Sequence, residues 1–333
     1  MKNKYRNIFL AFGIIAVLIM IFTFDMDYQE LWLNLKRAGV YLPLVLLLWL
    51  FVYLINTVSW YIIIRSGGKT GFSFVRLYKF TVTGFALNYV TPVGLMGGEP
   101  YRIMELKPYI GIERATSSVI LYVMMHIFSH FCFWLSSVLL YVCLYPVGWM
   151  MGIILGAITV FCLLIVILFM KGYRQGMAVA FVRMGGRIPF LKKKVFHFAN
   201  AHKEKLENID KQIALLHQQK KQTFYSALLL EYTARVVSCL EIWLILNVLT
   251  THVSFADCCL IAAFSSLLAN LLFFLPMQLG GREGGFALAV GGLSLSGVYA
   301  ALITRIREMV WIVIGLVLMK VGNFKQSKER YSA

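Results

Sequence analysis

The amino-acid sequence predicts an all-α, polytopic membrane protein with about eight transmembrane helices, broken or re-entrant helices among them, and two related, inverted halves. Three observations predict this fold. Of the 333 residues, 60% are hydrophobic and only 14% are charged, whereas soluble globular proteins carry about 25% charged residues. The run 42–64 holds no charged residue, and a helix of about 20 such residues crosses the hydrocarbon core of a bilayer. Basic residues gather between the apolar runs, as they do on the cytoplasmic side of membrane proteins.

The first apolar stretch, 8–24, follows three basic residues within the first six positions. No cleavage site of small residues comes after it, because Phe22, Phe24 and Met26 occupy that region. We therefore expect a retained first span with a cytoplasmic N-terminus, and not a signal peptide. The later stretches that are apolar enough to cross the membrane are 40–64, 116–145, 149–170, 223–250, 255–275, 284–300 and 302–321.

One further apolar stretch, 77–96, does not fit a simple crossing. If it crossed, the segment 171–222 would lie outside the cell. That segment contains twelve Lys or Arg and three Asp or Glu, and such basic segments stay on the cytoplasmic side. We therefore predict that 77–96 enters from the cytoplasm and returns, or is broken partway. Such a backbone persists at membrane depth only where protein or a water-filled cavity surrounds it.

The basic segment divides the sequence into a first membrane half (1–170), a cytoplasmic part (171–222) and a second membrane half (223–333). The formal net charge is +17, but no motif that reads nucleic acid accompanies it, so we predict no nucleic-acid partner. Basic residues after the last span place the C-terminus in the cytoplasm as well. The cytoplasmic part holds four apolar residues at helical spacing, which predicts an amphipathic helix on or beneath the membrane: Leu206, Ile209, Ile213 and Leu216.

A helix-breaking motif lies at the end of the stretch 77–96 in the first half. Pro92 stands seven residues before Glu99. Gly97 and Gly98 lie between them, and Arg102 follows. Proline removes a backbone hydrogen-bond donor, and paired glycines adopt dihedrals that other residues resist and let a backbone or ligand come close. We therefore do not expect a continuous helix here.

The same arrangement recurs in the second half. Pro276 stands seven residues before Glu283, with Gly280, Gly281 and Arg282 between them. Interrupted apolar segments at corresponding places in two halves indicate the central site of a transporter. Free amides at the start of the next half-helix can hold an anion. The alternative is a pair of ordinary interfacial loops, because Pro-Gly turns are common at the ends of spans.

Ten ionisable residues lie within or beside the apolar stretches, five of them acidic and five of them arginines. A charge in the membrane is costly unless it is paired or faces water, so we predict an interior of balanced, mutually paired charge. Glu231 and Arg235, four residues apart, predict an intrahelical salt bridge more than a ligand role. The ten are Glu99, Arg102, Glu231, Arg235, Glu241, Arg282, Glu283, Arg305, Arg307 and Glu308.

Six of these residues form the predicted substrate-binding site. The guanidinium fork of an arginine beside each break matches phosphate oxygens, and the glutamate beside it can orient the arginine or bind a cationic head group. For Arg305 the alternative is an interfacial anchor. The six are Glu99, Arg102, Arg282, Glu283, Arg305 and Glu308.

No metal and no cofactor are predicted. His126 and His130 lie one helical turn apart without a third ligand, which favours hydrogen bonds to a neighbouring helix over a metal site. The six cysteines lie in apolar stretches and form no CxxC pair, so we interpret them as small packing residues. Four tryptophans near proposed span ends are interpreted as an interfacial belt: Trp32, Trp49, Trp60 and Trp149.

The two motifs resemble those of the lysylphosphatidylglycerol synthase transmembrane-region family, which includes the flippase half of the multiple peptide resistance factor and stand-alone membrane proteins. The resemblance rests on Gly-Gly-Glu-Pro-x-Arg at 97–102, Pro-x-x-Leu-Gly-x-x-Glu at 276–283 and the charged run 305–308. Met277 and Gln278 replace two glycines of the family pattern. The resemblance implies movement of a lipid with a charged head group between leaflets: a phospholipid, an aminoacyl-phospholipid or a polyprenyl-linked carrier.

The resemblance also implies that two-part members carry a soluble synthetase domain after the membrane part. This sequence ends at Ala333, so we expect no lysine transfer from tRNA. One alternative function is an enzyme that modifies a lipid head group, for instance of the phosphatidylglycerol lysyltransferase type, with Glu99 or Glu283 as general base. Another is a membrane scaffold that recruits a soluble partner. The predicted partners are membrane lipids. Further predicted partners are a second copy of this chain, in a homo-oligomer, or a separate lipid-modifying enzyme. The predicted location is the inner cell membrane.

Overall fold

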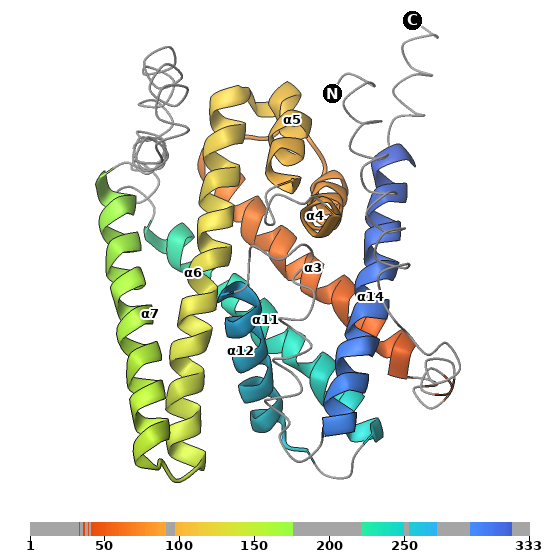
Figure 1. Cartoon of the computed structure of the whole chain (residues 1–333). Helices are drawn as coiled ribbons and strands as arrows, with labels where there is room; N and C mark the ends of the chain where they lie inside the picture. The colour runs from red at the N-terminus through yellow and green to blue at the C-terminus, as the bar shows by residue number, and fades with distance from the viewer. Residues whose placement is uncertain are drawn as a thin grey trace, which may run out of the picture. The chain divides into compact units, whose positions relative to one another are not determined.

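The protein is all-helical in the part of the chain that the structure describes (Figure 1). The structure is a computed structural model that describes residues 41–90, 97–175, 221–249, 253–271 and 294–321, together with Leu33, Lys36 and Gly39. The all-α prediction is confirmed within these ranges. Their eight helices are α3 (Tyr41–Ser66), α4 (Phe74–Val90), α5 (Gly98–Ile110), α6 (Ile112–Leu144), α7 (Trp149–Gln175), α11 (Lys221–Leu249), α12 (Phe255–Leu271) and α14 (Ser294–Val321).

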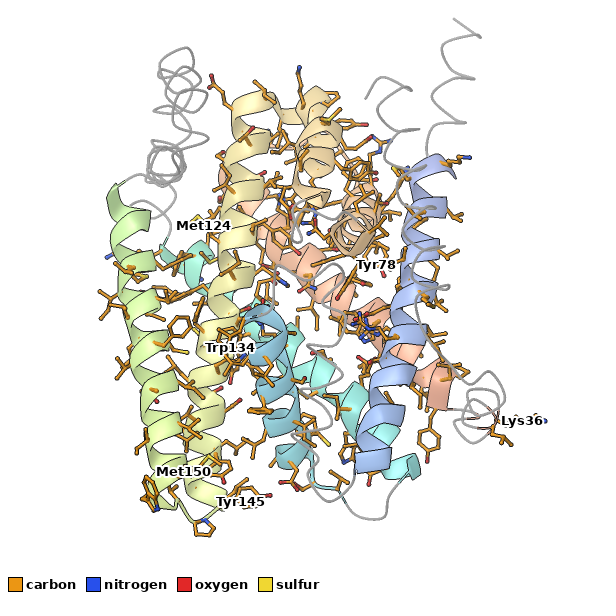
Figure 2. All side chains as sticks on the ribbon, viewed as in Figure 1. Lys36, Tyr78, Met124, Trp134, Tyr145 and Met150 are labelled. Carbon is orange, nitrogen blue, oxygen red and sulfur yellow. The ribbon has the colours of Figure 1, made fainter. Side chains whose placement is uncertain are left out.

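Three of the described helices are long and apolar enough to cross a membrane, and they match three predicted spans. They are α3, α6 and α7. Figure 2 shows Tyr145 and Met150 at the turn that joins α6 to α7, where both side chains are exposed. Apolar side chains also stay exposed along α7, among them Ile153, Val160 and Ile167, as expected of a helix that faces lipid. The count of about eight spans and the relationship of two halves stay predictions.

Two other sequence predictions fall on residues outside the described ranges. The first predicted span, 8–24, is one of them, and the amphipathic helix within 171–222 is the other.

The chain forms two compact units, and each takes residues from both sides of the basic segment. Unit 1 draws its described residues from Met1–Thr57, Ser73–Arg102 and Ala234–Ala333. Unit 2 draws them from Val58–Phe72 and Ile103–Thr233. The division into 1–170, 171–222 and 223–333 concerns the sequence and stays a prediction.

The core of unit 1 brings together α3, α11, α12 and α14. Val45, Leu246, Cys258 and Ile303 are buried against one another in it. A second group joins α3, α4 and α14 through Tyr53, Val82 and Trp311. α4 lies along α14, and the Thr83 hydroxyl donates a 3.1 Å hydrogen bond to the Gly315 carbonyl oxygen. Burial of these apolar side chains fixes the charged residues of the same helices in place.

The structure describes the stretch 77–96 only as far as Val90. α4 ends at Val90, and α5 begins at Gly98 with the chain direction reversed. The Gly98 amide lies beside Asn88, and three residues later the Tyr101 ring lies beside that of Phe80, which is further back along α4. The chain therefore retraces α4, as a re-entrant segment would. Entry of this segment from the cytoplasmic side stays a prediction.

α14 corrects one predicted boundary. The sequence predicts separate stretches, 284–300 and 302–321, whereas one helix runs from Ser294 to Val321. No proline or glycine lies between residues 298 and 310. Nothing in that part of the backbone interrupts the helical hydrogen bonds, so the helix continues through the predicted break.

Unit 2 contains the antiparallel pair α6 and α7 (Figure 1). The Phe128 and Phe169 rings stack between these two helices with centroids 4.6 Å apart. At the start of α6, Arg114 donates hydrogen bonds to carbonyl oxygens at the end of α3, at 2.7 Å to both Ile64 and Gly68. Carbonyl oxygens at a helix end lack N–H partners further along that helix, so Arg114 caps the end of α3 and the residues after it and ties them to α6.

Candidate functional site

Buried charged side chains of unit 1 gather in two clusters. The break cluster lies where α5 folds back on α4 and consists of Asn88, Glu99 and Arg102. The ion-pair cluster joins α3, α11 and α14 and consists of Trp49, Glu241, Arg305, Arg307 and Glu308. Charges among apolar helices are costly unless they are paired, so such clusters indicate functional or structural sites.

The break cluster is built by the start of α5. Glu99 lies in the first turn of that helix, where the helix dipole favours a carboxylate. Asn88 of α4 closes the fold-back, because its side chain donates to Glu99 Oε1 at 2.9 Å and accepts from the Gly98 amide at 2.6 Å. The sequence predicts that free amides at the start of this helix could bind an anion. The Gly98 amide instead donates its hydrogen bond to Asn88.

Arg102 is held on several sides. Its side chain is only 1% exposed, and its Nη1 lies 3.4 Å from Glu99 Oε1. Its Nη2 donates to the Thr81 carbonyl oxygen at 3.3 Å, and its guanidinium carbon lies 4.8 Å from the centroid of the Phe85 ring. Gly84 leaves the space for this side chain, because a Cβ there would collide with the guanidinium group. The fold therefore positions Arg102 to hold Glu99.

The Glu99 side chain is more open than that of Arg102, with 18% of its surface exposed. Its Oε1 receives hydrogen bonds from Asn88 and Arg102. Its Oε2 is buried and has no hydrogen-bond partner among the described residues. A buried acceptor without a partner is destabilising, so this oxygen can accept a hydrogen bond from a donor that arrives with a ligand.

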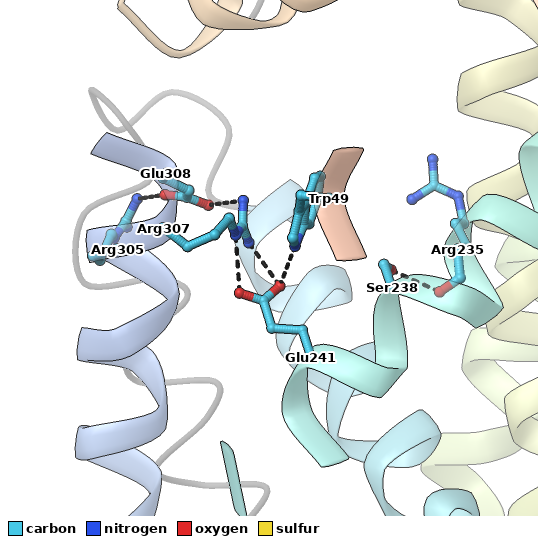
Figure 3. Close-up of polar contacts among 7 residues, drawn as sticks. All are labelled: Trp49, Arg235, Ser238, Glu241, Arg305, Arg307 and Glu308. Carbon is cyan, nitrogen blue, oxygen red and sulfur yellow. Dashed lines mark hydrogen bonds and ion pairs between the residues drawn. The ribbon is translucent and has the colours of Figure 1, made fainter. Parts of the chain in front are cut away.

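The ion-pair cluster centres on a two-point contact between α11 and α14 (Figure 3). Arg307 donates from Nε to Glu241 Oε1 at 2.9 Å and from Nη2 to Glu241 Oε2 at 2.8 Å. The Trp49 indole donates to the same Oε2 at 2.8 Å. The Arg307 guanidinium carbon also lies 3.7 Å from the centroid of the Trp49 ring. One carboxylate thus pairs with Nε and Nη2 of a buried arginine, and an aromatic face covers its guanidinium group.

A second pair completes the ion-pair cluster. Arg305 Nη1 lies 2.9 Å from Glu308 Oε2, and Arg307 Nη1 lies 3.9 Å from Glu308 Oε1. All four charged side chains are buried, and their formal charges cancel. The prediction of paired interior charge is confirmed for Arg305, Arg307, Glu308 and Glu241. Burial of Arg305 also argues against the interfacial anchor that the sequence left open.

Aromatic side chains connect the two clusters within unit 1. The Phe85 ring, which carries Arg102 on its face, lies 5.3 Å from that of Tyr53. Tyr53 in turn lies 5.4 Å from Trp49, which carries Arg307. A chain of aromatic rings therefore joins the two buried arginines within unit 1.

The structure brings together four of the six predicted site residues, two in each cluster. Glu99 lies with Arg102, and Arg305 lies with Glu308. Gly97 and Gly98 lie at the start of α5, and Gly98 touches α4 so closely that a Cβ there would collide with the Gly84 carbonyl. Six further predicted residues lie outside the described ranges: Arg282, Glu283, Pro92, Pro276, Gly280 and Gly281.

Sequence reasoning left Glu241, Arg307 and Trp49 out of the site. Glu241 and Arg307 are both charged residues in apolar stretches. They are 66 residues apart in the sequence, so no local pattern predicts that they pair. The sequence predicts both Trp49 and Trp60 as interfacial belt residues. The structure corrects both, because Trp49 donates to Glu241 and Trp60 is fully buried against Tyr122.

In unit 2, His126 makes the contact that the sequence predicts for it. Its Nδ1 lies 2.8 Å from Oε2 of Glu231 on α11, so the predicted hydrogen bond to a neighbouring helix is confirmed. No group of three or more His, Cys, Asp or Glu that could hold a metal ion occurs among the residues that the structure describes.

Comparison with known proteins agrees with the motifs. The sequence profile of the family described as lysylphosphatidylglycerol synthase TM region matches residues 8–318, which include both clusters. No curated protein and no solved structure gives a significant match. A match over nearly the whole chain shows the family. This multi-pass membrane protein therefore belongs to the lysylphosphatidylglycerol synthase transmembrane-region family.

Proposed function

We propose that this protein binds a lipid with a charged head group and moves it between the leaflets of the membrane. The family description names lysylphosphatidylglycerol, a lipid whose head group carries both a phosphate and amines. A charged head group cannot cross the hydrocarbon core unless polar protein groups replace its water. The paired charges of unit 1 supply such groups among apolar helices.

The observation that carries this proposal is the geometry of Glu99. Its Oε2 is buried without a hydrogen-bond partner among the described residues, while its other oxygen is held by Asn88 and Arg102. A fixed carboxylate with one free oxygen matches an ammonium or hydroxyl donor on a lipid head group. Arg102 holds the carboxylate, and Arg282 and Glu283 of the second motif are proposed to meet the phosphate and the remaining donors.

A vesicle assay tests this function. The purified protein is placed in vesicles that contain acyl-chain-labelled phosphatidylglycerol or lysylphosphatidylglycerol, and dithionite reduces only the label in the outer leaflet. We expect the wild type to move label between leaflets. We expect Glu99→Gln to slow this movement at least about tenfold, the equivalent of about 1.4 kcal/mol, because the amide loses the charge of the carboxylate.

Glu105→Gln is the matched control, because Glu105 lies on the same helix and outside the break cluster. We expect it to move lipid at the wild-type rate. A wild type that moves neither lipid contradicts the proposed function, and a fully active Glu99→Gln contradicts the role of Glu99. Chromatography of the lipids after the assay separates movement from chemical modification of the head group.

A further inference from the structure

Two buried hydrogen-bond donors lie one helical turn apart on α14 in unit 1. Arg307 is 3% exposed and Trp311 is 7% exposed. Arg307 Nη1 and Trp311 Nε1 are both buried without a hydrogen-bond partner among the described residues. Residues four apart on a helix lie on the same face, so both donors belong to one side of α14. A buried donor without an acceptor is destabilising, so two of them on one face indicate a place where an acceptor binds.

The neighbouring carboxylates leave Arg307 Nη1 without a hydrogen bond. Glu241 accepts from the other two nitrogens, Nε and Nη2, at 2.9 and 2.8 Å (Figure 3). Glu308 Oε1 lies 3.9 Å from Nη1, which is too far for a hydrogen bond, and Glu308 Oε2 is paired with Arg305 at 2.9 Å. The Arg307 side chain is therefore held in place, and one arm of its guanidinium group is left to donate to a ligand.

Aromatic packing fixes Trp311 beside the ion-pair cluster. Its ring centroid lies 4.9 Å from that of Tyr53, and Tyr53 lies 5.4 Å from Trp49 of the cluster. Tyr53, Val82 and Trp311 form one buried apolar group. These apolar neighbours cannot replace the water that the indole N–H loses on burial. The Trp311 donor is thus positioned next to Arg307 and needs an acceptor that a ligand brings.

The two ends of the aromatic chain in unit 1 offer hydrogen-bonding atoms of opposite kind. Tyr53 packs on Phe85 at 5.3 Å, and the Phe85 ring carries Arg102, which holds Glu99. At that end Glu99 Oε2 is a buried acceptor that has no partner in the described part of the chain. At the other end lie the two donors of α14. A lipid head group with an amine or hydroxyl and a phosphodiester carries the complement of both.

The charge of the ion-pair cluster indicates which acceptor fits. The formal charges of its two arginines and two glutamates cancel, so the cluster holds no excess positive charge that would draw a free anion out of water. The acyl chains of a lipid supply their own binding free energy in an apolar setting. Its phosphodiester then needs only donors that replace its water. A lipid phosphodiester therefore fits better than inorganic phosphate.

We propose that Arg307 Nη1 and Trp311 Nε1 form a donor subsite for the phosphodiester oxygens of a lipid head group, an inference that rests on the proposed function. The subsite lies in the same unit as Glu99 and adds to the contact proposed for Arg282. Both donors are buried in this structure. A head group therefore reaches them only when the partly buried side chains packed around Trp311, such as Tyr78, move aside.

Indole NMR signals test this subsite without any lipid movement. The protein carries isotope-labelled tryptophan in maltoside micelles, which contain no phosphate, and Trp311→Phe assigns the Trp311 signal. Short-chain phosphatidylglycerol is expected to shift the Trp311 N–H signal downfield, because the N–H becomes hydrogen-bonded. A short-chain diacylglycerol, which keeps the ester carbonyls and lacks the phosphate, is expected to leave the signal unchanged. Inorganic phosphate alone is expected to leave it unchanged as well.

Each other result of this measurement overturns the subsite. A signal that does not respond to phosphatidylglycerol shows that no lipid oxygen reaches Trp311. If that signal is already downfield without lipid, an internal water occupies the donor. A response to the diacylglycerol assigns the donors to an ester carbonyl, and a response to inorganic phosphate assigns them to a free anion.

The variants give a second test. Trp311→Phe keeps an aromatic ring and removes the N–H, and Arg307→Lys keeps a cation beside Glu241 and removes the second arm. We expect each to slow the movement of phosphatidylglycerol in vesicles about tenfold, as for loss of one hydrogen bond to a charged oxygen. Trp243→Phe is the matched control, because Trp243 lies on α11 of the same unit and is 37% exposed. We expect it to keep the wild-type rate.

Thermal unfolding separates lost binding from lost packing. Each variant is compared with itself, with and without short-chain phosphatidylglycerol. We expect the lipid to raise the Tm of the wild type and of Trp243→Phe, because a ligand that binds the folded state stabilises it. The rise is expected to be much smaller for Trp311→Phe. An equal rise in Trp311→Phe, or a wild-type rate of lipid movement in it, would overturn the inference.

The outcomes also separate the two proposals. A wild type that moves no lipid, while its Trp311 signal responds to phosphatidylglycerol, contradicts the proposed function and supports the subsite as a place of lipid binding. A wild type that moves lipid, while its Trp311 signal stays unchanged, overturns this inference alone.

Discussion

At the scale of single residues, several charged side chains are buried among apolar helices and need partners there. Arg307 makes a two-point contact with Glu241 and lies on the face of Trp49. Trp49 serves twice, because its indole N–H also donates to Glu241. Removing one member of such a set leaves the others buried without partners, so the energetic cost of a substitution depends on which member is lost.

We expect Glu241→Leu to lower the free energy of unfolding by about 3–5 kcal/mol, because Arg307 is left as an unpaired buried charge. We expect Trp49→Phe to lower it by about 1–3 kcal/mol, because the aromatic face stays and only one hydrogen bond is lost. Detergent-induced unfolding followed by circular dichroism measures both.

The double variant Glu241→Leu with Arg307→Leu gives the sharper comparison. We expect it to be more stable than Glu241→Leu alone, because it removes both charges together. Trp149→Phe is the control, since Trp149 is 79% exposed at the start of α7. Equal stability of Glu241→Leu and Trp149→Phe would show that the ion pair contributes nothing.

At the scale of elements, the fold-back of α5 on α4 depends on two glycines. Gly98 meets the Gly84 carbonyl so closely that a Cβ on Gly98 would collide with it, and Gly84 also leaves room for Arg102. Close backbone approach is a known use of glycine. The two glycines therefore set the distance at which Asn88, Glu99 and Arg102 meet.

We expect Gly98→Ala to destabilise the protein by about 1–3 kcal/mol, because the added methyl group pushes α5 away from α4. It should also slow lipid movement, since the Asn88–Glu99 contact would be stretched. Gly156→Ala on α7 is the control, because a Cβ there meets nothing within 4 Å. Unfolding and vesicle assays on both variants measure the effects. Wild-type behaviour of Gly98→Ala would refute the fold-back as the positioning element.

At the scale of the whole molecule, membrane orientation follows from charge and from the fold-back. The basic segment 171–222 is kept in the cytoplasm if 77–96 does not cross. α4 and α5 retrace each other, and α6 and α7 are expected to cross the membrane in turn. The loop around Gly71 is therefore expected on the cytoplasmic side, and the turn at Gly148 on the outer side.

Cysteine labelling on intact cells checks this orientation. Gly71 and Gly148 are both exposed, and a Cβ at either meets nothing within 4 Å, so Gly71→Cys and Gly148→Cys are expected to fold. In a background with the exposed Cys143 changed to Ser, an impermeant maleimide should label Gly148→Cys directly. It should label Gly71→Cys only after the cells are permeabilised. The reverse pattern would mean that the orientation is wrong.

The amino-acid sequence by itself determined the properties that are local along the chain. Apolar runs without charges determined α3, α6 and α7, because a helix that crosses lipid must be apolar along its whole length. The proline-glycine motif predicted an interruption close to the point where α4 ends at Val90 and α5 begins at Gly98. Glu99 and Arg102 could be paired in advance, because residues three apart on one helix are neighbours.

Only the tertiary structure decided which distant charges meet. Glu241 and Arg307 are 66 residues apart, and His126 and Glu231 are 105 residues apart. Helical periodicity describes one helix at a time, so it cannot say which faces of different helices come together. That choice depends on the packing of whole helices. Because of this packing, Trp49, which the sequence predicts as an interfacial belt residue, donates a hydrogen bond to the buried ion pair.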